Sequence, residues 1–183
     1  MKGTLFVELL SLIESKYGLE VLDAVIEAGG SSLSTSGAYT RVGNYPHEEI
    51  FTLATAVCKV SGDSLESLLD DFANSMVCAF HRMHPAFFAE NPDILDFLDA
   101  LESQIHTEVR KLYPDAKPPL VLARRIDKDS MEISYQSSRP LAPMAIALTR
   151  ATAEFLNQPV SIEVINLAAN HKEMMMKVSR SHA

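Results

Sequence analysis

Three side chains that can donate hydrogen bonds follow one another at every second position in the second half of the chain. They are the phenol of Tyr135, the hydroxyl of Ser137 and the guanidinium of Arg139. A β-strand is expected here, and because strand side chains alternate between faces, the three should share one face within about 13 Å. An arginine can bind a carboxylate through two parallel hydrogen bonds. The row therefore suits a ligand that carries carboxylates, although an ordinary exposed strand has a similar polar composition.

A second candidate is His106, in the longest helix that the sequence predicts. Apolar residues recur at spacings of three and four from about 92 to 113, and His106 borders the stripe that they form. A neutral imidazole at this border can project into a cavity and bind a metal through one ring nitrogen. The same spacing also fits a half-exposed helix histidine without a ligand.

The elements expected around these residues change character at Pro114. Before it, apolar spacing predicts amphipathic helices; after it, β-branched alternation predicts two hairpins and one buried helix. Helices are expected at 3–17, 19–28, 46–60, 64–84, 92–113 and 142–156, with one further turn at 85–90, and strands at 120–126, 131–137, 160–165 and 172–178. Helices first and strands afterwards predict an α+β fold, in which a helical part precedes an antiparallel sheet with a packed helix.

Length and composition exclude several classes of protein. The 183 residues, 47% of them hydrophobic, favour one domain over 1–183, with a helical part to about 113 and a sheet-containing part from about 114. The net charge of −8, without a basic stripe, argues against a nucleic-acid partner. There is no uncharged apolar run of about 18 residues, and Cys58 and Cys78 are too few for a disulfide framework. We therefore expect a cytoplasmic protein without membrane spans, and no motif of a catalytic triad or phosphate loop predicts an enzyme.

The stretch from His106 to Arg139 resembles the haem-nitric oxide/oxygen-binding family, H-NOX, which is related to the haem domain of soluble guanylate cyclase. Two motifs carry the resemblance: the run Arg-Lys-Leu-Tyr-Pro at 110–114 follows the histidine, and Tyr-x-Ser-x-Arg comes about twenty residues after that run. The opening Met-Lys-Gly and the order of helices are similar too. The resemblance implies the H-NOX fold, with haem b between the helical part and the sheet. His106 would then be the proximal iron ligand, Tyr135, Ser137 and Arg139 would bind the propionates, and Pro119 would press on the porphyrin.

The resemblance also bears on which gas would bind. Dioxygen on iron gains negative charge and profits from a hydrogen-bond donor, which oxygen-binding members supply with a distal tyrosine, whereas nitric oxide binds ferrous iron strongly without one. The matching position here is Met144. None of the candidate pocket residues offers a strong donor: Leu5, Leu9, Met76, Phe80, Met144 and Leu148. This implies a sensor that binds nitric oxide and carbon monoxide and excludes dioxygen, although each of these residues also fits an ordinary core.

The resemblance further implies a non-catalytic sensor that acts on a separate protein, namely a histidine kinase or a cyclic-dinucleotide signalling enzyme. The alternative is a haem-free binding module of the same fold. It would carry another apolar ligand with a carboxylate, such as a fatty acid or a linear tetrapyrrole, on the same strand donors.

Overall fold

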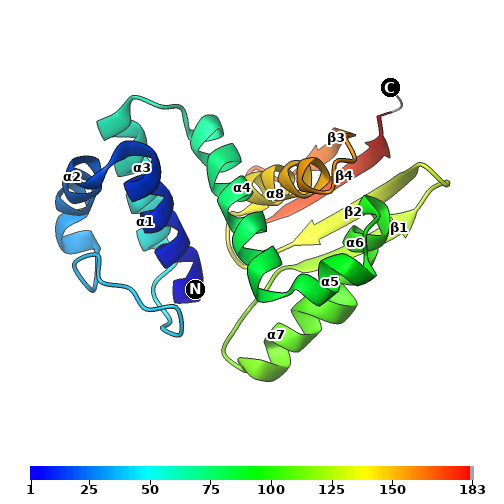
Figure 1. Ribbon diagram of the computed structural model, residues 1–183, viewed down its shortest axis with the longest axis horizontal. Coiled ribbons are helices and arrows are strands. Elements are labelled where there is room, and N and C mark those ends of the chain that lie inside the picture. The colour runs from blue at the N-terminus through cyan, green and yellow to red at the C-terminus, as the bar shows by residue number, and fades with distance from the viewer. Residues whose placement is uncertain (182–183) are drawn as a thin grey trace. The chain divides into compact units, whose positions relative to one another are not determined.

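The computed structural model of the protein describes residues 1–181 (Figure 1). The chain forms two compact units, Met1–Met76 and the part from Val77 onward, and each is described by itself. Among the described residues, no helix combines the length and the apolar character needed to cross a membrane.

The first unit is helical. Its elements are α1 (Gly3–Tyr17), α2 (Leu19–Gly29), a single 3-10 turn (Gly30–Ser32), α3 (Glu48–Ser61) and the first part of α4 (Leu65–Met83). Gly62, with φ of 81°, ends α3 in the left-handed conformation that glycine adopts without strain. The core is built from apolar side chains one helical turn apart, among them Phe6, Leu9 and Ile13 of α1. The predicted helices of this region are confirmed.

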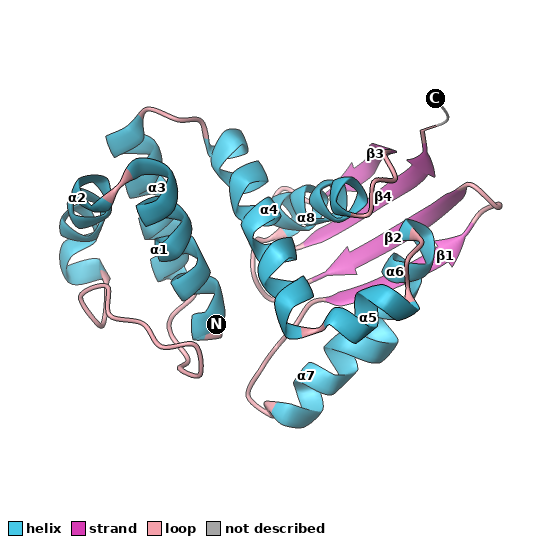
Figure 2. Ribbon diagram, in the orientation of Figure 1, coloured by secondary structure: helices cyan, strands magenta, loops and turns pink. Residues whose placement is uncertain are grey.

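The second unit contains a four-stranded antiparallel sheet with strand order β1-β2-β4-β3 (Figure 2). The strands are β1 (Leu120–Arg125), β2 (Ser130–Gln136), β3 (Val160–Leu167) and β4 (Glu173–Arg180), and α8 (Ala142–Phe155) connects β2 to β3. Met131, Ile133 and Tyr135 alternate with more exposed residues along β2 and are buried against α6 (Ile94–Ala100) and α8. The predicted α+β fold with an antiparallel sheet is confirmed. β3 runs two residues further than expected, and its register with β4 shifts between Val164 and Asn166.

The long helix expected from 92 to 113 forms as one helical run, but its central part is a π-helix and not an α-helix. After α5 (Pro85–Glu90) come α6, a π-helical segment (Leu101–His106) and α7 (Thr107–Leu112). In this π segment the amide of Thr107 bonds to the carbonyl of Glu102, five residues back, and the Thr107 hydroxyl bonds to the same carbonyl at 3.0 Å. The π segment thus has six residues, its turns are wider than those of an α-helix, and His106 is its last residue.

The beginning of α6 is fastened to the sheet by Asp93. Its carboxylate caps the helix by accepting hydrogen bonds from the amides of Leu95, at 2.9 Å, and Asp96, at 3.2 Å, and it pairs with Arg180 of β4. Burial raises the pKa of Asp93, but the Arg180 guanidinium and the two amides lower it more, so that the pKa lies below its ordinary value. Ionised Asp93 therefore stabilises the contact between α6 and β4.

We expect Asp93→Asn to lower the free energy of unfolding at pH 7 by about 1 kcal/mol, because asparagine keeps the cap but loses the charge that faces Arg180. A carboxyl whose pKa is lowered by folding stabilises the protein above its unfolded pKa and loses this effect as pH falls through the folded pKa. Urea unfolding should therefore show a difference in the free energy of unfolding between wild type and Asp93→Asn at neutral pH. This difference should disappear as the pH falls below 3.8, the ordinary pKa of an aspartate. Asp99→Asn, at an exposed position of the same helix, is the control and should change stability by less than about 0.5 kcal/mol. A difference that stays constant with pH would contradict this role of the charge.

Candidate functional site

His106 is the last residue of the π segment, and only 13% of its side chain is exposed. Its Nδ1 lies 2.9 Å from a carboxylate oxygen, Oε2, of Glu102. An ionised carboxylate can only accept hydrogen bonds, so Nδ1 carries the proton. In the neutral ring this tautomer leaves Nε2 with a free electron pair, which is the form of imidazole that binds a metal.

Glu102 receives hydrogen bonds from three groups. Besides the His106 ring, the backbone amide of Val121 donates to Oε2 at 3.1 Å, and the Arg110 guanidinium bonds to Oε1. Burial raises the pKa of Glu102, but these donors lower it more and hold it below its usual range. Sequence reasoning missed Glu102, although a glutamate four residues before a helix histidine has the spacing of a side-chain pair.

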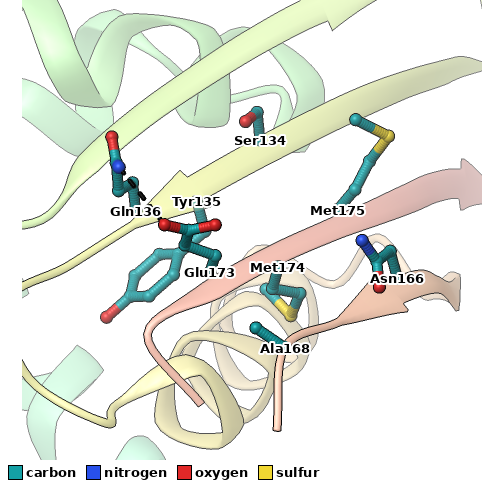
Figure 3. A pocket seen from close by; sticks show the side chains of 8 residues that line it. All are labelled: Ser134, Tyr135, Gln136, Asn166, Ala168, Glu173, Met174 and Met175. Carbon is teal, nitrogen blue, oxygen red and sulfur yellow. Dashed lines mark hydrogen bonds between the residues drawn. The ribbon is translucent and has the colours of Figure 1, made fainter. Parts of the chain in front are cut away.

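Tyr135 is 4% exposed and belongs to the buried face of β2. Figure 3 shows its ring on the same side of the sheet as Met174, whereas Ser134 and Met175 point to the other side. Burial raises the pKa of the Tyr135 phenol, while a hydrogen bond with the Ser137 hydroxyl and the positive charge of Arg139 act to lower it. The three side chains that the sequence predicted as a row are thus close together.

A turn, and not strand alternation, brings Ser137 and Arg139 to this place. β2 ends at Gln136, one residue before Ser137. The Ser137 hydroxyl accepts a hydrogen bond from the Arg139 amide at 3.1 Å, and the Arg139 guanidinium donates to the carbonyl of Lys117 at 2.9 Å. The expectation that all three residues alternate along one strand is therefore wrong in its geometry, because the short Ser137 side chain bonds to the backbone two residues on.

Pro119 lies in the segment that joins these groups to His106. Arg139 binds the carbonyl of Lys117, two residues before this proline, and Glu102 binds the amide of Val121, two residues after it. Val121 is in turn paired with Tyr135 in the register of β1 and β2. Within the second unit, hydrogen bonds thus link His106, through Glu102, and Arg139 to the short segment that contains the half-buried Pro119.

The six apolar pocket candidates belong to both units. In the second unit, Met144 is buried in the first turn of α8, Leu148 is half-buried one turn later, and Phe80 of α4 packs near Phe97 with ring centroids 6.5 Å apart. Leu5, Leu9 and Met76 belong to the first unit, where Leu9 is buried and the other two are half-buried. That the six residues line one pocket stays a prediction.

A pocket of about 280 Å³ on the sheet has one residue in common with the predicted site, Tyr135 (Figure 3). Its other lining residues belong to β2, β4 and β3, apart from Ala168, which directly follows β3. Gln136 and Glu173 bond across it at 3.5 Å. None of the described residues that line it has a cationic side chain to bind a carboxylate.

The chain matches one protein-family model over most of its length. The model described as haem-NO-binding matches residues 2–164. The chain belongs to this family. Its members, also called H-NOX domains, bind haem and are gas-sensor modules that are not themselves catalytic.

Solved structures agree with this assignment. The Fe(II) unliganded H-NOX protein from K. algicida is 30% identical, with a TM-score of 0.90 over 100% of this chain and 98% of that chain. The H-NOX from Shewanella woodyi, solved in solution with IWP-051 bound in the Fe(II)CO state, is 31% identical, with a TM-score of 0.85 over 99% and 95%. A mutant of the H-NOX from T. tengcongensis, at 19% identity, shares the fold, with a TM-score of 0.87 over 100% and 98%. No curated protein matches the chain.

Proposed function

We propose that this H-NOX domain is a haem-based sensor of nitric oxide that signals to a separate effector protein. In this proposal Nε2 of His106 binds the iron of haem b. The tautomer of His106 carries the proposal, because Glu102 engages Nδ1 and leaves Nε2 as the ligand atom. When bound, the haem would supply an iron that takes up a diatomic gas.

Tyr135, Ser137 and Arg139 would bind the two haem propionates. The set offers a phenol, a hydroxyl and a guanidinium, all of which donate hydrogen bonds, and the guanidinium adds a positive charge. Arg139 uses one nitrogen, Nη1, to bond the carbonyl of Lys117, which orients the rest of its planar group. The donor set thus fits a ligand with two carboxylates, and Pro119 would lie against the porphyrin.

The absence of donors among the pocket side chains favours nitric oxide and carbon monoxide over dioxygen. Leucine, methionine and phenylalanine side chains have no N–H or O–H group, so none of the six pocket candidates can stabilise the negative charge of bound dioxygen. Met144, buried at the start of α8, takes the place of a distal tyrosine in this proposal.

The output would pass to a histidine kinase or a cyclic-dinucleotide signalling enzyme. The family's role as gas-sensor modules without catalysis of their own supports an effector in a separate protein. We further propose a cytoplasmic location, which suits the free thiols of Cys58 and Cys78.

We expect the purified protein to show a strong Soret band, and His106→Ala to lose it and regain it with added imidazole. The substitution removes the ligand atom and leaves space that free imidazole can occupy. Absorption spectra after reconstitution with hemin measure both effects, and His84→Ala, at an exposed histidine of the same unit, should keep the band. A colourless wild-type protein that does not take up hemin would favour the haem-free binding module.

Arg139→Leu should release haem to a scavenger protein about 10- to 100-fold faster than wild type, because a charge-assisted hydrogen bond contributes about 1.5–3 kcal/mol. Arg124→Leu, at a 68% exposed arginine of β1, should change the rate little. Haem with esterified propionates should leave wild type and Arg139→Leu at similar rates. Equal release of ordinary haem from both would refute the proposed contact.

The ferrous protein in air should form no stable oxygen complex, whereas nitric oxide and carbon monoxide should each shift its absorption bands. Met144→Tyr adds a phenol donor and should confer measurable oxygen affinity, while Met144→Phe, with a ring but no hydroxyl, should not. Stable oxygen binding by the wild type would show that the pocket contains a donor outside the six predicted residues.

A further inference from the structure

We propose that Glu102 is the positioning residue of His106, and that it couples the imidazole to strand β1. This inference rests on the proposed function, in which His106 binds iron. It adds a role for a residue that neither the resemblance nor the comparisons single out. The charge of Glu102 would set how strongly Nε2 donates to the metal, and its second hydrogen bond would tie that imidazole to the sheet.

The carboxylate is placed by the π segment and is largely shielded from water. Glu102 and His106 are both in this segment, and their side chains are 20% and 13% exposed. The hydroxyl and amide of Thr107 both bond to the Glu102 carbonyl, which fixes the backbone beneath the pair. A metal-binding histidine usually donates its other ring N–H to such an acceptor, and this raises the basicity of the ligand nitrogen.

One oxygen of Glu102 serves both the ring and the strand. Oε2 accepts from His106 Nδ1 at 2.9 Å and from the Val121 amide at 3.1 Å. Among the described strands β1 lies at an edge of the sheet, so its outward amides face no neighbouring strand there, and Glu102 satisfies the one at Val121. On its other side Val121 is paired with Tyr135. A displacement of the ring therefore acts directly on the strand beside the proposed propionate-binding group.

Arg110 engages the remaining oxygen, Oε1, from a position about two helical turns after Glu102. With both oxygens engaged, the carboxylate cannot rotate without losing hydrogen bonds. A glutamine at this position would keep one oxygen as a neutral acceptor, but its NH₂ group would face either the donors of the ring and strand or the Arg110 guanidinium. Glu102→Gln thus tests the charge, and Glu102→Ala tests the whole contact.

The experiment is resonance Raman spectroscopy of the ferrous, unliganded holoprotein. We expect the iron–histidine stretching band to move to lower frequency in Glu102→Gln and further in Glu102→Ala, with a more positive reduction potential in the same order. Haem release to a scavenger should become roughly 10-fold faster or more in Glu102→Ala, as is typical when such a partner of a metal ligand is removed. Glu108→Gln makes the same charge change at a 56% exposed position near His106 and should leave band and potential unchanged.

Amide hydrogen exchange of the same proteins tests the link to β1. The amide of Val121 should exchange faster in Glu102→Ala than in wild type and in Glu108→Gln, because it loses its acceptor. The wild type alone gives a further test, since the Nδ1 proton of its iron-bound histidine should exchange slowly in proton NMR. Rapid exchange of that proton would overturn the inference even if both Glu102 variants failed to fold.

The outcomes separate this inference from the function on which it rests. If the wild type bound no haem, or showed no iron–histidine band, the proposed function would fail and the inference with it. If the wild type showed the band and neither Glu102 variant moved it, only the positioning role would be refuted. A shift equal to that of Glu108→Gln would reduce the effect to general electrostatics and would equally overturn it.

Discussion

A single carboxylate, that of Glu102, is bonded to an imidazole, to a strand amide and to a guanidinium from different parts of the second unit. A carboxylate that loses much of its contact with water needs such donors, because an unpaired buried charge is costly. The ring of His106 and the backbone of β1 share one acceptor atom, so neither can shift far alone. The arrangement of the candidate site depends on this shared acceptor more than on any other contact.

Much of the fold can be predicted from the spacing of apolar residues, because a helix or strand that buries one face repeats apolar residues at a fixed interval. Met131, Ile133 and Tyr135 had to face the core together once β2 was a strand, and Phe6, Leu9 and Ile13 had to form one stripe once α1 was a helix. The motifs around His106 and Tyr135 then sufficed for the family, which the match over residues 2–164 shows.

The finer geometry of the site could not be predicted from these patterns. The spacing of apolar residues does not indicate where a helix changes from α to π geometry. A prediction that assumes about 100° per residue throughout therefore places His106 at the border of the apolar face. The wider turn ends at that histidine, whose side chain is mostly covered. The sequence likewise predicts Ser137 as part of a strand. The hydrogen bond from the Arg139 amide to its hydroxyl, which forms the turn, depends on the local backbone conformation and not on apolar spacing.

The π segment also sets the direction in which His106 faces. An ordinary α-helix of the same length would carry the imidazole about 100° further around the axis relative to Ile94, Leu95 and Leu98, because the π turn takes up one extra residue. Those three side chains are buried against the sheet and cannot follow such a rotation. Tightening of the segment to α geometry would therefore turn the histidine away from its present place while the helix still covered the sheet.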